Sequence, residues 1–254
     1  MSKRRCNTDN ADVFIGAWHK TGINAIKSLF RLYKEDVPTF EFQFKKKLGI
    51  GFNHYVLEHS KVILCIRNPY ETIVSGMRYH QKTKEKWCIQ PHERYGGISY
   101  KEHISNLETE EEKLLFEMRE NAYLTITSMY DFVRDHSQYE IYSKTSKNIK
   151  EKTPDGTWRE KGYNINDNIV FIRLEQFETE EGRQEIVDTI TSHVPNMDKD
   201  ILAECIQAHG RKKFNKTHDG SGYTYDQHFT GKLYHEFDEL FPEDLFEVLG
   251  YQRK

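Results

Sequence analysis

The chain has 254 residues and a formal net charge of −3, and 37% of its residues are hydrophobic. This length fits one α/β domain, and 15 tyrosines and 15 phenylalanines are enough for a sizeable core. A general nucleic-acid binder would carry a basic surplus over the whole domain, so the charge argues against a nucleic-acid partner. A local basic pocket for a small anion is compatible with it.

The N-terminus gives no targeting signal. Residues 1–10 are polar and charged, and they lack the apolar segment of a signal peptide. No stretch approaches the ~20 apolar residues that span a bilayer. We therefore expect a cytoplasmic protein without a membrane partner. A disordered tail over residues 1–11 and one domain over residues 12–254 are predicted.

The cysteines and histidines show no metal-binding pattern. The four cysteines are widely spaced and include no C-x-x-C pair, so reduced thiols are expected. Cys65 lies within an apolar run, which indicates a buried thiol. No His-Glu-x-x-His spacing occurs, and we assign no metal ion.

Three short apolar segments are predicted to be buried parallel strands: Val13–Trp18, Val62–Ile66 and Ile169–Leu174. They are rich in branched residues and lack clean alternation, as expected when helices cover both faces of a sheet. A helix is predicted directly after each of the first two. Alternating strands and helices predict a single α/β domain with a central, mainly parallel sheet flanked by helices.

Two predicted helices carry clear sequence signals. In the first, Ile26, Leu29, Phe30 and Tyr33 recur with helical spacing and form one apolar stripe. The second begins Asn68-Pro69-Tyr70-Glu71, which supplies an N-cap, a proline in the first turn and an early acidic residue. Further helices are predicted over Ala122–Val133, Arg183–Val194, Lys199–His209 (ended by Gly210) and near Pro242–Leu249.

The loop after the first strand has the elements of an anion site. His19-Lys20-Thr21-Gly22-Ile23-Asn24 joins the strand to a helix N-terminus, whose amides and positive dipole end favour a phosphate. It is not a Walker A motif, because Lys20 precedes the glycine instead of following it. An ordinary strand-to-helix turn with an exposed lysine explains this loop equally well.

The end of the second strand favours the anion site. Arg67 follows Ile66 directly and precedes the capped helix that carries Ser75. An arginine at this position can bind a phosphate through two parallel hydrogen bonds, although a surface ion pair is the common alternative. Two phosphate-type sites at adjacent strand ends would suit a nucleotide with phosphates at two places.

These segments resemble the sulfotransferases that use 3′-phosphoadenosine-5′-phosphosulfate (PAPS) and release 3′-phosphoadenosine 5′-phosphate (PAP). Residues 19–22 resemble the loop that binds the 5′-phosphosulfate, and residues 67–75 resemble the 3′-phosphate segment, in which an Arg and a Ser stand eight apart. Residues 172–177 and 237–251 resemble later segments of the family. The resemblance covers residues 13–251, with residues 82–168 poorly matched, and implies a P-loop-kinase-like sulfotransferase fold.

The resemblance implies a set of cofactor-binding residues. They are His19, Lys20, Thr21, Gly22, Ile23, Asn24, Ala25, Arg67, Ser75, Arg211 and Lys212. The chain departs from the family where many members have Thr-Thr-Trp after the loop glycine. Ile23-Asn24-Ala25 stands there, so two phosphate-binding hydroxyls and an adenine-stacking Trp are missing.

Sulfuryl transfer requires a group that stabilises the leaving oxygen and a base that accepts the proton of the acceptor. Lys20 is the predicted stabiliser. In the family the base comes from a short strand between the two phosphate segments, and His54 is our choice there because an imidazole titrates near neutral pH. Glu58 and His59 are the alternatives, and His54 could instead be a structural histidine.

The predicted function is therefore PAPS-dependent sulfation of a hydroxyl or amine on a small metabolite or natural product, by a monomer or a homodimer. Two alternatives stay open: a P-loop-type nucleotide or small-molecule kinase, and a non-catalytic nucleotide-binding relative. Aromatic residues of the unmatched middle could line the acceptor pocket or belong to the core. They are Trp87, Tyr95, Tyr100, Tyr123 and Tyr130.

Overall fold

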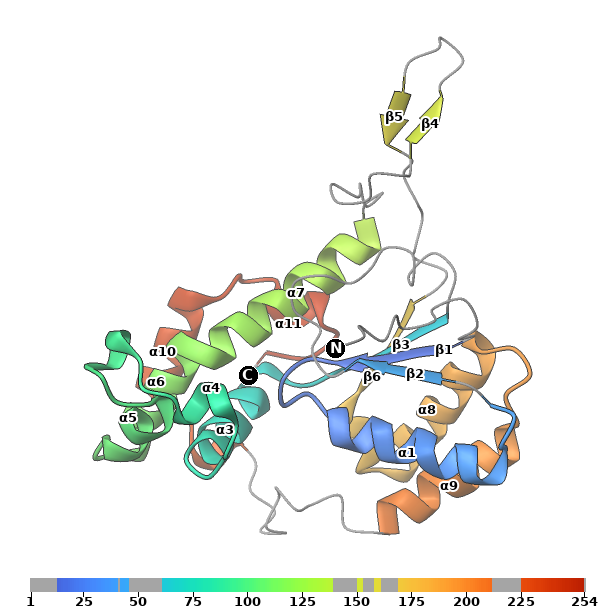
Figure 1. Ribbon diagram of the computed structural model, residues 1–254, viewed down its shortest axis with the longest axis horizontal. Coiled ribbons are helices and arrows are strands. Elements are labelled where there is room, and N and C mark those ends of the chain that lie inside the picture. Colours follow the sequence, from blue (N-terminus) through green and yellow to red (C-terminus); the bar gives the residue numbers. More distant parts are fainter. Residues whose placement is uncertain are drawn as a thin grey trace, which may run out of the picture.

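Four strands form a parallel sheet at the centre of the molecule. They are β1 (Val13–Ala17), β2 (Phe42–Lys45), β3 (Lys61–Ile66) and β6 (Ile169–Arg173), in the spatial order β2-β1-β3-β6 (Figure 1). The computed structural model describes residues 13–40, 42–45, 61–138, 150–152, 158–160, 169–211 and 225–253. The predicted α/β class with a parallel sheet is confirmed, and the three predicted strands lie within one residue of the observed ones.

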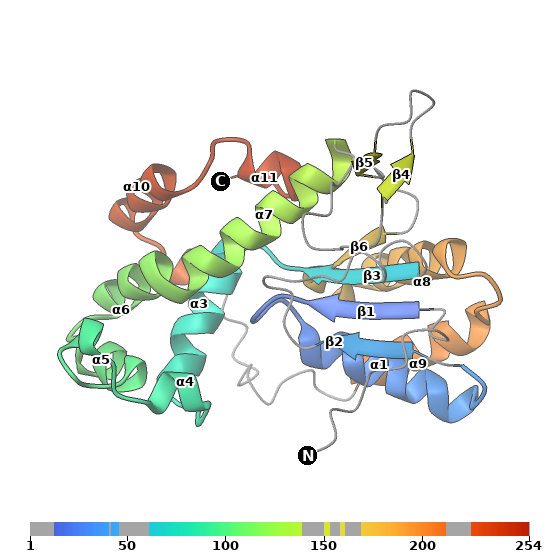
Figure 2. The same cartoon turned by 45° about the horizontal axis from the view of Figure 1, so that its top comes forward.

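The carboxyl ends of the parallel strands lie along one edge of the sheet. Val13 pairs with Lys61, and Val62 pairs with Ile169, so β1, β3 and β6 run side by side in the same direction. Figure 2 shows β1 and β3 pointing towards helix α3 (Pro69–His80). In open parallel sheets ligands bind outside this edge, which makes it the place to examine for function.

One face of the sheet is covered by α1 (Ile23–Asp36), α8 (Glu180–His193) and α9 (Lys199–Arg211) (Figure 1). Successive strand side chains alternate between faces, and in β3 Ile63 and Cys65 enter the core on this side. The predicted apolar stripe of α1 is confirmed, since its four members are no more than 1% exposed.

Helices of the chain's middle and C-terminal end share a second core with the other face of the sheet. There α3, α6 (Glu110–Glu117) and α7 (Tyr123–Gln138) pack with two C-terminal helices, α10 (Gly231–Leu240) and α11 (Leu245–Val248). Tyr70 lies at the centre of this core, with four phenylalanine or tyrosine rings of the C-terminal segment within 5.0 Å of its own ring. The C-terminal segment is thereby held against α3.

Smaller elements complete the described chain. They are α4 (Lys86–Ile89), η2 (Glu93–Tyr95), α5 (Tyr100–Asn106), the π-helical turn η3 (Met118–Ala122), the hairpin strands β4 (Lys150–Lys152) and β5 (Trp158–Glu160), η5 (Leu174–Phe177) and η6 (Tyr225–Gln227).

The helix-start signals gave better predictions than the helix-stop signals. The N-cap at Asn68 is confirmed, because its side chain accepts from the Tyr70 amide at 2.9 Å. The predicted stop at Gly210 is wrong, since α9 continues to Arg211. At the C-terminal end, α11 is a single turn over Leu245–Val248, shorter than predicted.

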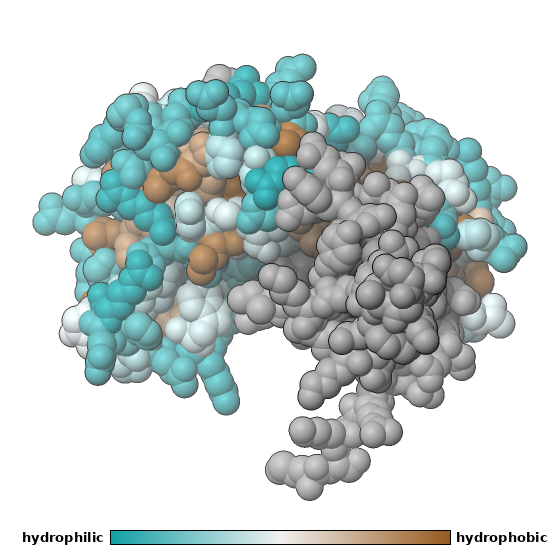
Figure 3. All heavy atoms as spheres, turned by 90° about the horizontal axis from the view of Figure 1, so that it is seen from above, coloured by the Kyte–Doolittle hydropathy of each residue, from teal (hydrophilic) through white to brown (hydrophobic). Residues whose placement is uncertain are grey.

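The described surface is mainly polar. Figure 3 shows hydrophilic side chains over most of the described part of one face, with apolar residues in small groups between them. The large apolar side chains that are most exposed are Ile89, Tyr123 and Leu124. None of the described helices is long and apolar enough to cross a membrane. Cys65, Cys88 and Cys205 are buried free thiols, as expected of Cys65.

Candidate active site

The loop between β1 and α1 lies against the ends of two other strands. Gly22 has φ +104°, and a Cβ at this position would lie 2.7 Å from the Cys65 sulfur and 2.8 Å from a Leu174 methyl. Lys20 also has a left-handed backbone, with φ 64°, which is uncommon for a residue with a side chain. This tight turn brings the N-terminus of α1 to the edge where β3 and β6 end.

The polar groups of this loop divide into two sets. The Thr21 hydroxyl is buried and donates to the carbonyls of Trp18 and Cys65, both at 3.0 Å, so it secures the turn. Helix α1 begins at Ile23 without a side-chain cap, and Asn24 is exposed. The first-turn amides of a helix have no partner within that helix, so this N-terminus suits an anion.

Lys20 places its ammonium over an aromatic ring. The Nζ atom lies 3.6 Å from the centroid of Tyr79, a residue of α3. Burial and then the neighbouring Arg67 lower the pKa of Lys20 to about 8, against the opposing effect of Glu117 and Glu85. Within the described part of the chain no carboxylate pairs with Lys20. The lysine is therefore a partly desolvated cation that an anionic ligand would stabilise.

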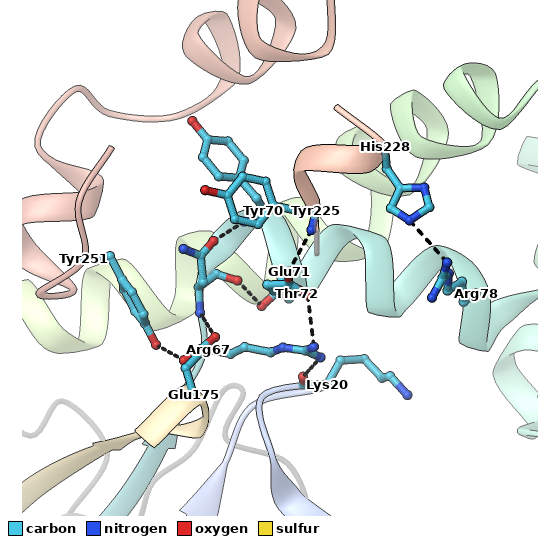
Figure 4. Close-up of polar contacts among 11 residues, drawn as sticks. Lys20, Arg67, Tyr70, Glu71, Thr72, Arg78, Glu175, Tyr225, His228 and Tyr251 are labelled. Atoms are coloured by element: carbon cyan, nitrogen blue, oxygen red, sulfur yellow. Dashed lines mark hydrogen bonds and ion pairs between the residues drawn. The ribbon is translucent and has the colours of Figure 1, made fainter. Parts of the chain in front are cut away.

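Arg67 links the second strand end to the first loop. Arg67 is 5% exposed, and its Nη1 donates to the Lys20 carbonyl at 3.2 Å. Its Nη2 lies 3.4 Å from a carboxylate oxygen of Glu71, one turn into α3 (Figure 4). The sequence-based alternative for Arg67 was a surface ion pair, and the pair observed is buried. A hydrogen bond thus joins the two predicted anion-binding residues, which follow adjacent strands.

Glu71 is a site residue that the sequence analysis assigned only to helix initiation. Its second carboxylate oxygen accepts the Tyr225 amide at 2.9 Å, which fixes η6 beside Arg67 (Figure 4). Tyr225 is the first described residue after residues 212–224. Tyr225 therefore lies next to the predicted 3′-phosphate site.

Glu175 ties the third strand end to the same edge. One of its oxygens accepts the Asn68 amide at 2.9 Å, and the other accepts the Tyr251 hydroxyl at 2.8 Å (Figure 4). Residues 172–177, one of the segments that resembled the family, therefore lie at the site. The carboxylate serves to join β3, β6 and the C-terminal end.

Ser75 lies on the face of α3 that looks towards the loop. Residues 71, 75 and 79 follow each other at helical i, i+4 spacing and so share one stripe. Glu71 at one end of this stripe contacts Arg67, and Tyr79 at the other end contacts Lys20. The half-buried Ser75 lies between the two cations along the helix.

His19 lies beside a second histidine that the sequence analysis did not identify. Its Nε2 is 3.0 Å from Nε2 of His80, and Nδ1 of His80 is 2.7 Å from a Glu117 carboxylate oxygen. Gly76, an isolated glycine inside α3, was the available signal, because such a residue marks a close approach. A Cβ there would lie 2.3 Å from Glu117 Oε1.

Several predicted residues lie outside the described residues. They are the tail over residues 1–11, His54, Glu58, His59 and Lys212, together with the side chain of Arg211. Among the residues that the structure does describe, no group of three His, Cys, Asp or Glu side chains could hold a metal ion.

The sequence matches no protein-family model and no curated protein. Its structure is similar to the crystal structure of mouse sulfotransferase SULT7A1 complexed with PAP. The TM-score is 0.55 at 14% sequence identity, and the match covers 95% of this chain and 89% of the mouse protein. At this identity the match establishes a shared fold. The predicted sulfotransferase-type α/β fold is confirmed.

The aromatic residues of the poorly matched middle fall into two groups. Trp87 packs edge-on against His80 at 5.0 Å and against Tyr100 at 5.3 Å, on the side of the site where His19 lies. Tyr130 instead donates to Asp244, and Tyr123 packs on a C-terminal phenylalanine. Only the first group borders the predicted site, and the second joins α7 to the C-terminal segment.

Proposed function

We propose that this protein is a sulfotransferase that moves the sulfuryl group of PAPS to a hydroxyl or amine of a small molecule. The observation that carries the proposal is the coupling of two cations at adjacent strand ends, in which Arg67 Nη1 binds the Lys20 carbonyl at 3.2 Å. The fold shared with a PAP-bound sulfotransferase supports the same conclusion.

In this proposal the 5′-phosphosulfate occupies the N-terminus of α1. The amides of residues 22–25 would bind its phosphate, and the Asn24 side chain can add a donor where the family has a hydroxyl. The Lys20 ammonium would stabilise the bridging oxygen, which gains charge as the bond to sulfur breaks. A lysine with a pKa of about 8 is still mainly charged at neutral pH.

The 3′-phosphate would lie at Arg67 and Ser75. Arg67 carries five N–H donors, so it can bind a phosphate while retaining the Lys20 carbonyl. Glu71 competes for the same guanidinium and would have to release it in part. Ser75 can donate its hydroxyl from the neighbouring turn of α3. Arg211 and Lys212 remain candidates for a closing contact from the C-terminal side.

The acceptor would enter on the side of Trp87. This ring, with Tyr95 and Tyr100, forms an aromatic wall that continues to the His19 imidazole. Such a wall suits a small and largely apolar acceptor with one reactive hydroxyl or amine. Sequence reasoning assigns the base to His54, and the histidine pair His19–His80 is a second candidate.

The direct test is transfer of labelled sulfate from PAPS to a panel of phenols, alcohols and amines. We expect labelled product with at least one acceptor class, and we expect transfer to persist when a chelator removes magnesium. Phosphoryl transfer from ATP that depends on magnesium, with no sulfate transfer, would instead identify a kinase.

A further inference from the structure

A buried carboxylate and a buried imidazole lie next to the proposed site. Glu117 and His80 are at most 1% exposed, and His80 Nδ1 lies 2.7 Å from Glu117 Oε2. The Tyr100 hydroxyl donates to the same oxygen at 2.8 Å. A carboxylate buried this deeply is costly unless hydrogen bonds compensate for its lost hydration. Hydrogen bonds donated to a carboxylate oxygen stabilise the ionised form of a carboxylate.

The fold makes room for this carboxylate. His80 ends α3 and Glu117 ends α6, and 37 positions separate them in the sequence. Gly76 lies one turn before His80, and any side chain there would overlap Glu117, since even a Cβ would be 2.3 Å from its Oε1. The pair is therefore built into the packing of two helices.

His19 extends the pair to the loop that carries Lys20. The Nε2 atoms of His19 and His80 are 3.0 Å apart, and the ring planes differ by 5° with centroids 5.1 Å apart. Because the centroids are farther apart than the nitrogens, the rings meet edge to edge in nearly one plane. Glu117, His80 and His19 thus form a row of three side chains. His80 is fully buried and His19 is half-buried, so the row runs from the core to the site.

The hydrogen bonds assign the protons in this row. An ionised Glu117 only accepts, so His80 carries its proton on Nδ1 and has its lone pair on Nε2. His19 must then donate from its own Nε2 to His80. In the neutral state the basic atom of His19 is therefore Nδ1. In a catalytic triad a carboxylate orients one imidazole directly. Here the Glu117 carboxylate orients His80, and His80 in turn orients His19.

His19 and Lys20 act on the same part of the site. The Lys20 ammonium lies over the Tyr79 ring, and the His19 ring packs edge-on against that same ring with centroids 5.8 Å apart. Trp87 packs against both histidines and reduces their contact with water. The imidazole thus lies between the proposed stabiliser of the leaving oxygen and the aromatic wall proposed for the acceptor.

We infer that His19 is the general base of the transfer and that His80 and Glu117 position it; this inference rests on the proposed function. As the acceptor oxygen attacks sulfur, a new S–O bond forms and the bond from sulfur to the 5′-phosphate oxygen breaks. That oxygen keeps the electron pair. The acceptor proton passes to His19 Nδ1. The resulting imidazolium is stabilised through His80 by the Glu117 carboxylate, and the proton is later released to solvent.

Other titratable groups surround the two histidines. They are Lys20 on the same loop, Tyr79 on α3, Glu85 and Cys88 at α4, Tyr100 on α5 and Glu117 on α6. Burial raises the pKa of Tyr79, Cys88 and Tyr100, so these three are neutral near pH 7. Glu117 is then the anion in direct hydrogen-bond contact with the row.

The kinetic test compares His19→Asn, Glu117→Gln and His54→Ala at saturating PAPS. We expect His19→Asn to lower kcat by ~10²–10⁴-fold. Glu117→Gln should lower it by ~10–100-fold, as loss of an orienting partner does. Removing the negative charge disfavours the imidazolium, so the rising limb of the rate-against-pH curve should also move to lower pH in Glu117→Gln. A merely structural role would not shift that limb.

Exposed residues of the same types serve as matched controls. His235→Asn and Glu239→Gln, both on α10, should leave kcat and the pH profile unchanged. Stabilisation by PAP should persist in all variants, which shows that they fold and bind. If Glu117→Gln does not fold, kcat of His19→Asn decides the test, because His19 is only half-buried. Normal turnover in His19→Asn together with loss in His54→Ala would overturn the inference while leaving the proposed function intact.

The proton assignment can be tested without any transfer. In nitrogen-15 NMR of histidine-labelled protein, His80 should carry its proton on Nδ1 and His19 on Nε2, with resonances assigned from the His19→Asn and His80→Asn variants. The opposite tautomer at His19 would overturn the inference even if sulfate transfer is observed. Correct tautomers without any sulfate transfer to the acceptor panel would overturn both the base and the proposed function.

Discussion

The N-terminal end of helix α3 adjoins the Arg67 guanidinium, and the C-terminal end carries the His80 imidazole, which contacts a carboxylate and a second imidazole. Arg67 is held by the Lys20 carbonyl and by Glu71, which is itself held by η6. His80 contacts Glu117 through Nδ1 and accepts from His19 at Nε2. One helix thus separates a permanently charged group, suited to binding, from titratable groups, suited to proton transfer.

Lys20 contacts residues at both ends of helix α3. Its carbonyl binds Arg67, and its ammonium lies over Tyr79 near the histidines. Lys20 makes both contacts from a left-handed backbone conformation. We therefore expect substitution of Lys20 to reduce the rate of transfer and substitution of Arg67 to reduce nucleotide affinity.

The largest expected effect is on turnover at Lys20. Lys20→Met keeps a chain over Tyr79 but removes the charge, and we expect kcat at saturating PAPS to fall by ~10²–10³-fold. In the wild type kcat/KM should fall as the pH rises past about 8, because the ammonium loses its proton. Lys20→Arg should abolish that fall. Full kcat in Lys20→Met would remove Lys20 from the chemistry.

The second effect is on nucleotide affinity at Arg67. Arg67→Gln should raise the Kd for PAP by ~10–100-fold, the usual worth of a hydrogen bond to a charged group. It should change kcat at saturating PAPS far less, because the 3′-phosphate does not react. Arg67 also lowers the pKa of Lys20, so the alkaline limb of kcat/KM should move to higher pH in this variant. Titration calorimetry and a pH series measure the two effects.

Glu71→Gln is the matched variant for Arg67. A glutamine carbonyl can still accept the Tyr225 amide, but the charge that competes with a phosphate for Arg67 is gone. We expect PAP to bind a few-fold more tightly. Weaker binding would mean that Glu71 holds Arg67 in its binding geometry and does not compete with the ligand.

The fold could be predicted from local signals, whereas part of the site could not. Strand β3 and the cap at Asn68 were predictable because an apolar run and an Asn-Pro start act over a few residues. The edge strand β2 was missed, because it has only four residues, Phe42–Lys45, and pairs with β1 alone. The predicted stop at Gly210 failed because a glycine can continue a helix at a modest cost.

Lys20 and Arg67 were predictable as a pair, since parallel strand ends must meet along one edge. The contact of His80 with Glu117 was not, because several helices intervene and no spacing rule spans 37 positions. Gly76 marks the contact, but a glycine alone does not say what approaches it. His80 and Glu117 therefore come together only through tertiary packing, which local sequence signals do not reveal.

The central claim is that this edge binds a nucleotide phosphorylated at two places. Titration calorimetry with PAP and with adenosine 5′-phosphate, on the wild type and on Arg67→Gln, tests it most directly. We expect PAP to bind the wild type at least ~10-fold more tightly, the lower end of the hydrogen-bond value used for Arg67. Most of that difference should disappear in the variant. Equal affinities of the wild type for the two nucleotides would contradict the claim.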